Sequence, residues 1–212
     1  MRKTIKVIES SESERLAQIY LVAATIFCEK GYDATSMSDI AEAVGITKAG
    51  IYHYVKSKQD LLFKIMSFGM ETLEKDVIIP AKGIADAETR LKAIIANHAR
   101  LITEGSTPNG HNPVTIINDE VGGLTAAQRR KIINRKRVYL DLLRETLNQL
   151  KNEGKLKDVN ITVATFSLFG MLLWVSRWYR SNGSITVDQL VEEMSKIALG
   201  GILRPQARLS KK

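Results

Sequence analysis

The stretch TSMSDIAEAVGITKAGIYHYVKSK, at residues 35–58, decides the fold of this chain. Ser36 and Asp39 have the spacing of a capping box, which predicts that a helix begins just after Ser36. Gly45 predicts the end of this helix, because glycine enters the left-handed conformation at little cost. Thr47 is a preferred capping residue and predicts a second helix directly after the turn. The stretch therefore predicts two short helices, the second reaching about residue 54, joined by a tight turn.

Two short helices joined in this way are typical of a helix-turn-helix, which points the N-terminal residues of its second helix at base edges in the major groove. The small residues Ala49 and Gly50 would allow close approach to a duplex, and Lys48 can reach a phosphate or a guanine edge. Tyr52 and His53 would point toward the DNA backbone or the groove wall. An αα-hairpin inside a helical bundle is the alternative, and periodicity alone does not separate the two interpretations.

The residues themselves go further, because the stretch resembles the DNA-binding domain of the TetR family of bacterial repressors. The resemblance is carried by Thr35, Ile40-Ala41, Val44-Gly45-Ile46-Thr47, Gly50-Ile51-Tyr52, Lys58 and Leu61, and upstream by Ala23-Ala24, Phe27 and Gly31-Tyr32. The base or phosphate contacts that it implies are those of Thr47, Lys48, Gly50, Tyr52 and His53. It also implies phosphate contacts by Ser36 and Lys58, each at the start of a helix. Tyr54-Val55 departs from the commoner family pattern, which leaves open whether His53 or Tyr54 faces the DNA.

The whole chain predicts an all-α fold, with an N-terminal three-helix domain and a larger helical bundle. The expected domains are a DNA-binding domain at 11–58, a ligand-binding and dimerisation domain at 59–203, and a basic tail at 204–212. The helices expected outside the opening stretch are 11–30, 58–77, 86–104 and 126–152, with a weaker one at 114–118. Asp158 or Asn160 is expected to start a further helix that runs to Arg180, and Thr186 to cap a last helix that ends at Gly200-Gly201. Pro80 is expected to close the fourth helix, and Gly122-Gly123 to break the chain before residue 126.

The net charge of +8 is distributed unevenly along the chain. Residues 1–60 have a net charge of zero, residues 61–128 of −2 and residues 129–212 of +10. The positive excess therefore lies outside the predicted helix-turn-helix. DNA binding must depend on a few placed cations, namely Lys48, Lys56 and Lys58, to which a flexible N-terminal arm with Arg2, Lys3 and Lys6 could add.

The last two predicted helices carry more apolar surface than a monomer would cover. The residues concerned are Phe166, Phe169, Gly170, Leu173 and Trp174 on one helix and Leu190, Met194, Ile197 and Ala198 on the other. They predict a homodimer interface, with ordinary core packing as the alternative. A homodimer also suits the proposed partner, double-stranded operator DNA, because two reading helices can bind two half-sites.

Several classes of protein are disfavoured by the sequence. The run at 161–175 is interrupted by polar residues and is shorter than the roughly 20 residues of a membrane span. No signal peptide is recognisable, and the single Cys28 fits a reducing compartment, so we expect a cytoplasmic protein without a membrane partner. His53, His98 and His111 lack acidic neighbours at metal-ligand spacing, and no catalytic motif is present. We expect no enzyme and no cofactor or metal; a non-specific basic nucleic-acid-binding bundle remains an alternative.

Basic and aromatic residues downstream suggest an effector site. Arg130 and Arg137 fall on one stripe of the helix expected at 126–152, which is either a solvated face or a site for an anionic group such as phosphate. Trp174, Arg177 and Trp178 could cap a pocket mouth or form the rim of the dimer interface.

The pattern Trp174, Trp178-Tyr179-Arg180 and Gly183 is similar to that of TetR-family repressors of fatty-acid and steroid catabolism. This second resemblance implies an acyl-CoA thioester as the small-molecule effector. The ligand-binding residues would be Arg130, Arg137, Trp174, Arg177 and Trp178. A drug or another aromatic or apolar effector is the alternative.

Overall fold

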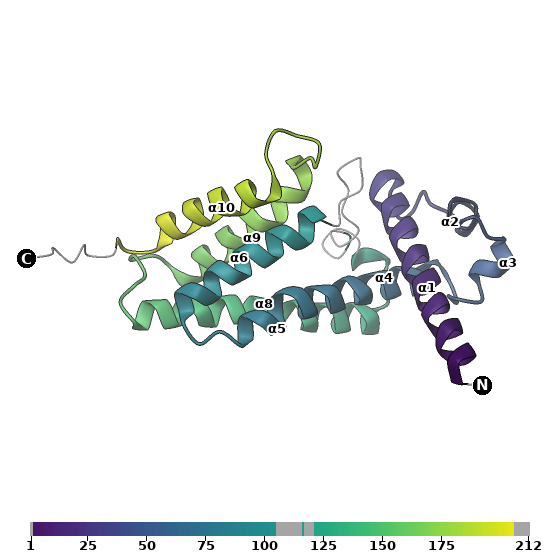
Figure 1. Ribbon diagram of the computed structural model, residues 1–212, viewed down its shortest axis with the longest axis horizontal. Helices are drawn as coiled ribbons and strands as arrows, with labels where there is room; N and C mark the ends of the chain where they lie inside the picture. Colours follow the sequence, from purple (N-terminus) through teal and green to yellow (C-terminus); the bar gives the residue numbers. More distant parts are fainter. Residues whose placement is uncertain (1, 105–115, 117–120, 206–212) are drawn as a thin grey trace, which may run out of the picture. The chain divides into compact units, whose positions relative to one another are not determined.

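A computed structural model of the chain describes residues 2–104, 116 and 121–205. The regular elements in these ranges are all helices, accompanied by one isolated β-bridge between Leu156 and Leu203, so the all-α prediction is confirmed (Figure 1). The chain forms two compact units. Unit 1 contains Met1–Glu71 and His111–Ile133, and unit 2 contains Thr72–Gly110 and Asn134–Lys212.

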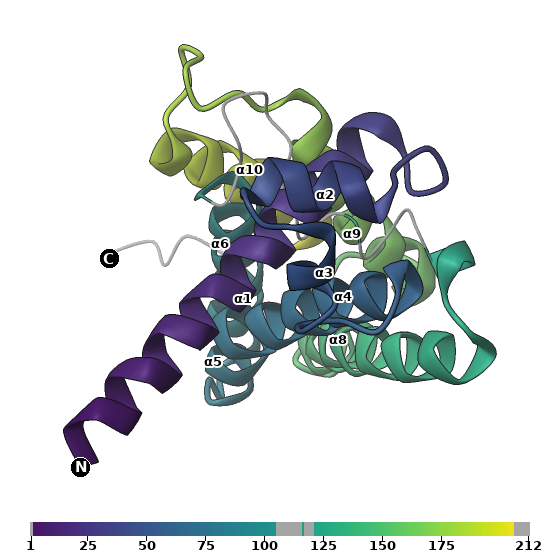
Figure 2. The ribbon, with the colours of Figure 1, turned by 90° about the vertical axis from the view of Figure 1, so that its right-hand side faces the viewer.

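Unit 1 begins with the long helix α1 at Arg2–Lys30, against which α2 at Met37–Val44 packs (Figures 1 and 2). Ile19, Ala23 and Phe27 of α1 are buried and supply its part of the core. The predicted start near residue 11 and the flexible arm before it are wrong, since residues 2–10 are helical. No glycine or proline interrupts this segment, so nothing in the sequence opposes its continuation into α1.

The helix-turn-helix follows the sequence prediction in its caps. Ser36 and Asp39 exchange two hydrogen bonds, of 2.8 and 3.2 Å, in a complete capping box. Gly45 has a φ of 75°, and the next N–H, of Ile46, donates to the Ala41 carbonyl at 2.9 Å. The hydroxyl of Thr47 accepts from the Gly50 N–H at 2.9 Å and starts α3 at Lys48–Ile51. This second helix is shorter than expected, because residues 52–54 form a turn.

The fourth helix does not end at Pro80. The α-helical part, α4 at Lys58–Leu73, runs into a π-helical turn, η1 at Glu74–Ile78, and then into α5 at Ile79–Lys82 (Figure 1). Pro80 lies in the first turn of α5 and has no N–H to donate to the helical turn before it. The helix nevertheless continues through Pro80, and the chain leaves it only at Gly83.

Unit 2 is a bundle that contains α6 at Ala87–Glu104, most of α8 at Ala126–Asn152, α9 at Ile161–Trp178 and α10 at Val187–Ile202 (Figure 1). The apolar core between these helices includes Leu91, Ile94, Leu143, Leu147, Leu168, Leu172 and Leu190. Asn160 and Thr186 cap α9 and α10 through their side chains, as expected.

Two helix ends in unit 2 differ from the prediction. α9 stops at Trp178 instead of residue 180, because Tyr179 is extended. α10 continues through Gly200-Gly201 and ends at Ile202, and the extended backbone of the next residue, Leu203, pairs with Leu156. Glycine weakens a helix but does not stop it when no left-handed turn follows. The weaker helix expected at 114–118 lies outside the described residues except for position 116.

Candidate DNA interface and effector region

Of the eight residues predicted to contact DNA, seven lie at the N-cap of α2, in α3 and directly beside α3, and Lys58 opens α4. We call Ser36, Thr47, Lys48, Ala49, Gly50, Tyr52 and His53 the reading surface. All of them are exposed except Gly50, which is half-buried. Ile51 and Val55 point the other way and are buried. Tyr54 is half-buried, so His53 is the more accessible of the two aromatic residues that the sequence left open.

The hydroxyl groups of the reading surface keep a proton for an external acceptor. Ser36 and Thr47 each use an oxygen lone pair to cap a helix, accepting from Asp39 and Gly50. Because a hydroxyl is both donor and acceptor, its O–H can still donate to a phosphate oxygen. A Cβ at position 50 would lie 3.1 Å from the Thr47 hydroxyl oxygen, so a larger residue there would crowd this cap.

Lys58, expected to bind phosphate, is engaged inside unit 1. Its Nζ donates to the carbonyls of Tyr32, Asp33 and Thr35, at 2.8, 3.3 and 2.9 Å, and lies 4.4 Å from the centre of the Tyr32 ring. An ammonium group has three protons, so these carbonyls account for all of them. A phosphate contact by Lys58 would have to replace one of these bonds.

The five effector residues predicted from sequence fall into two groups on different helices. Arg130 and Arg137 lie on the exposed face of α8, opposite the buried Ile132 and Tyr139. Trp174, Arg177 and Trp178 lie together on the last turns of α9, and all three are exposed. Arg135, which also lies on α8, makes two hydrogen bonds of 2.7 and 2.9 Å to Glu74 within unit 2.

Sequence reasoning gave no role to a polar pair in the core of unit 2. His98 of α6 and Tyr139 of α8 are both buried, with 2.7 Å between the imidazole Nδ1 and the phenol oxygen. Phe169 of α9 packs edge-on against Tyr139, with ring centres 4.9 Å apart. Burial lowers the pKa of His98 to about 4 and raises the pKa of Tyr139, so both are neutral near pH 7. The helical phase of His98 with Leu91 and Ile94 was the available signal that it faces inward.

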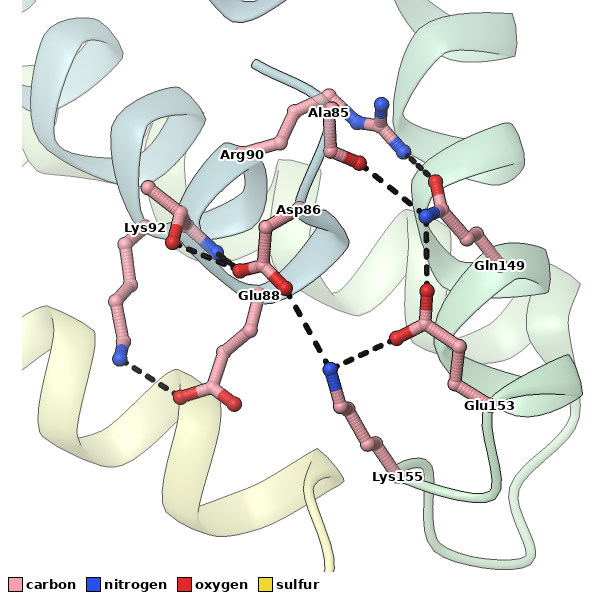
Figure 3. A network of polar contacts seen from close by, with 9 residues as sticks. Ala85, Asp86, Glu88, Arg90, Lys92, Gln149, Glu153 and Lys155 are labelled. Atoms are coloured by element: carbon pink, nitrogen blue, oxygen red, sulfur yellow. Dashed lines mark hydrogen bonds and ion pairs between the residues drawn. The ribbon is translucent and has the colours of Figure 1, made fainter.

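A polar network ties together three segments of unit 2 (Figure 3). Lys155 lies 3.5 Å from Asp86 and 2.9 Å from Glu153, and Gln149 donates to Glu153 and to the Ala85 carbonyl. Arg90 binds Gln149 and also donates to Thr146 at 2.9 Å. These groups bind one another, which marks the network as an anchor between the start of α6 and the end of α8 rather than as a ligand site.

One face of α9 is apolar and uncovered in the single chain. Val163, Phe166 and Trp174 expose 63, 56 and 64 % of their surface, and Gly170 lies between them with nothing within 4 Å of its Cβ position. Ile197 of α10 is also exposed, at 66 %. By length and composition α9 could cross a membrane, although 28 % of it is buried within the unit. In the described part of the chain, no group of three His, Cys, Asp or Glu side chains could hold a metal ion.

Two family models match the chain and together cover most of it. Residues 19–65 match the model of bacterial regulatory proteins of the tetR family. Residues 85–202 match the model of the tetracyclin repressor-like C-terminal domain. The first match contains the reading surface, and the second contains α6, α9, α10 and the His98–Tyr139 pair.

Individual relatives agree with these matches. The HTH-type transcriptional repressor KstR2 of Rhodococcus jostii is 30 % identical over 200 residues, which cover 92 % of this chain and 95 % of the relative. The fatty acid metabolism regulator protein of Bacillus subtilis is 25 % identical over 191 residues, or 87 % of this chain and 94 % of the relative. The crystal structure of AibR in complex with isovaleryl coenzyme A and operator DNA is 37 % identical, with a TM-score of 0.78, and covers 86 % of this chain and 97 % of AibR. The family and these relatives are transcriptional regulators.

Proposed function

Because the chain belongs to the TetR family of bacterial transcriptional repressors, we propose that it binds operator DNA as a homodimer and is released by an acyl-CoA thioester. The observation that supports the effector class is the similarity to AibR, whose crystal structure contains both isovaleryl coenzyme A and operator DNA. Release from DNA by the effector is our own proposal. We further propose that the protein works in the cytoplasm, where both partners are present.

In this proposal the reading surface enters the major groove. Lys48 contacts a base edge or phosphate, Ala49 and Gly50 allow the close approach, and Tyr52 and His53 contact the backbone beside them. Ser36 and Thr47 donate their remaining hydroxyl protons to phosphates. Lys58 supports DNA binding indirectly, because its ammonium holds the turn before α2 through three carbonyls. It contacts a phosphate directly only when one of these three bonds is exchanged.

The homodimer would form through the apolar face of α9 together with α10. The exposed Phe166, Trp174 and Ile197 support this arrangement, because uncovered apolar surface of this extent marks an interaction site. Gly170 would let two helices approach closely. Two copies would then present two reading surfaces to successive half-sites of a near-palindromic operator.

The effector would use both chemical halves of an acyl-CoA molecule. Its acyl chain suits the apolar interior of unit 2, where the His98–Tyr139 pair offers one place to hydrogen-bond a carbonyl oxygen. Its nucleotide carries phosphates, which suit cations and aromatic rings at the surface. We propose Arg130, Arg137, Trp174, Arg177 and Trp178 for this second role, within the region of +10 net charge.

A thermal-shift screen tests the effector class. Acyl-CoA thioesters of increasing chain length, beginning with isovaleryl-CoA, should raise the unfolding temperature, because a ligand that binds only the folded state stabilises it. Free coenzyme A, the free acids and aromatic drugs are the comparison set. The same thioesters should release the protein from operator DNA. Stabilisation by drugs alone, without any response to thioesters, would contradict the proposal and favour the aromatic-effector alternative.

A further inference from the structure

The short turn before α8 packs onto the part of unit 1 that supports the reading surface. This 3₁₀ turn, η3 at Val121–Gly123, places Gly123 directly against Leu62 and Tyr32. A Cβ on Gly123 would lie 2.8 Å from Leu62 Cδ2 and 2.9 Å from Tyr32 Cε1, distances at which something must shift. The neighbouring Gly122 has nothing within 4 Å of its Cβ position. Only one of the two adjacent glycines is therefore required by packing.

Side chains at the start of α4 and α8 hold this turn in place. The Gln59 side-chain amide donates to the Gly123 carbonyl at 2.9 Å, and Arg129 lies 3.4 Å from the Gly122 carbonyl. Thr125 and Gln128 exchange capping hydrogen bonds, so α8 begins at Ala126, three residues after Gly123. The turn is thus fixed both to unit 1 and to the first residues of α8.

The contact at Tyr32 leads to the helix-turn-helix through a short chain of bonds. The Tyr32 ring lies under the Lys58 ammonium, and Lys58 holds the carbonyls of Tyr32, Asp33 and Thr35. The next residue, Ser36, caps α2 and belongs to the reading surface. A displacement of the Tyr32 ring would therefore change the turn that sets where α2 begins.

We propose that Gly123 is a positioning residue for DNA binding, because its contact with Tyr32 and Leu62 sets the place of the reading surface within unit 1. The inference rests on the proposed DNA contacts of α2 and α3, and it is independent of the effector. It adds a residue outside the helix-turn-helix to those on which operator affinity depends.

The adjacent glycines provide a matched test. Wild-type protein first selects a duplex from a random-sequence pool, and this duplex is titrated at one fixed salt concentration with Gly122→Ala and Gly123→Ala. Gly122→Ala should bind within about twofold of wild type, since its methyl group meets nothing. Gly123→Ala should bind about tenfold more weakly, because an overpacked contact must displace Tyr32 or Leu62.

A second substitution separates positioning from loss of folding. Leu62→Val removes the carbon nearest to the added methyl group, and in the Gly123→Ala background it should restore most of the lost affinity. Circular dichroism and thermal unfolding give the folded fraction by which every affinity is corrected. Equal affinity of the two glycine variants overturns the inference, as does a loss that disappears after this correction.

The reading surface itself has a separate control. Lys48→Ala should weaken binding to the selected duplex and leave the contact of Gly123 with Tyr32 and Leu62 unchanged. If Lys48→Ala binds poorly while Gly123→Ala binds like wild type, the DNA contacts stand and the positioning role is wrong. If Lys48→Ala binds like wild type, the proposed reading surface fails instead.

Discussion

The reading surface of unit 1 and the core pair of unit 2 are held by different means. In unit 1, the bonds that shape the surface join residues three apart, Ser36 to Asp39 and Thr47 to Gly50. In unit 2, His98 and Tyr139 are 41 residues apart, and Arg90 and Thr146 are 56 apart. The caps within the reading surface are therefore local, although Lys58 and Gly123 place that surface within unit 1, whereas the core pair depends on the packing of several helices.

The largest expected effect is a loss of operator affinity when the proposed homodimer, which joins two reading surfaces, is broken. Phe166→Glu puts a charge on the uncovered face of α9, so the protein should become monomeric in analytical ultracentrifugation. Because binding through two linked surfaces gains affinity over one, operator affinity should fall about a hundredfold. Val138→Glu, on an exposed apolar position of α8, is the control and should stay dimeric. A dimeric Phe166→Glu protein would show that another face forms the interface.

The next effect is a pH dependence of folding stability that comes from the buried His98–Tyr139 pair of unit 2. His98 has a pKa of about 4 in the folded protein and near 6.5 when unfolded, so the unfolded state binds more protons between these values. Stability should therefore fall as the pH drops from about 6.5 towards 4, by at most about 3 kcal/mol. Urea unfolding at several pH values measures this. His98→Gln should flatten the dependence, and an unchanged slope would contradict the role of His98.

A comparable effect on DNA binding separates specific from general contacts. Lys48→Ala should cost about 1–3 kcal/mol of binding energy and relax the sequence preference at one position. Lys56→Ala, which removes an exposed cation outside the reading surface, should weaken binding to all sequences alike. Competition between selected and random duplexes measures both. An equal loss on both duplexes for Lys48→Ala would favour the non-specific basic bundle.

The smallest effect compares the same capping box in the two units. Ser36 caps α2 and Thr186 caps α10, and both receive the reciprocal bond. Replacement of either by alanine should cost about 1 kcal/mol of stability, measured by chemical unfolding. Only Ser36→Ala should also lose operator affinity, because only the Ser36 hydroxyl belongs to the proposed DNA interface. Equal DNA binding by the two variants would remove Ser36 from the proposed interface.

This comparison also explains what the sequence could predict. Ser36, Gly45, Thr47 and Thr186 were identified correctly because a cap or a left-handed glycine is read from the few residues around it. The resemblance to the TetR family is confirmed by the match of residues 19–65 to the family model. Its motifs could be recognised because they lie close together in the sequence, between Ala23 and Leu61.

Features that depend on distant residues were not predicted. The His98–Tyr139 bond joins two helices whose packing no local pattern encodes. Gly123 was recognised as a breaker, but its contact with Tyr32 requires the folded unit. Pro80 was misjudged because the π-turn before it, at residues 74–78, has no sequence signature comparable to a cap.

The pairing at the end of α10 has a practical consequence for protein engineering. The backbone N–H of Arg204 donates to the Lys155 carbonyl at 2.8 Å, and its guanidinium Nε donates to the Leu156 carbonyl at 2.9 Å. Lys157 in turn donates to the carbonyls of Ile202 and Gly200. A stop codon placed before position 204 would remove both Arg204 bonds and loosen the end of α10. Purification tags and fluorescent fusions are therefore best attached beyond Pro205, where they leave these bonds intact.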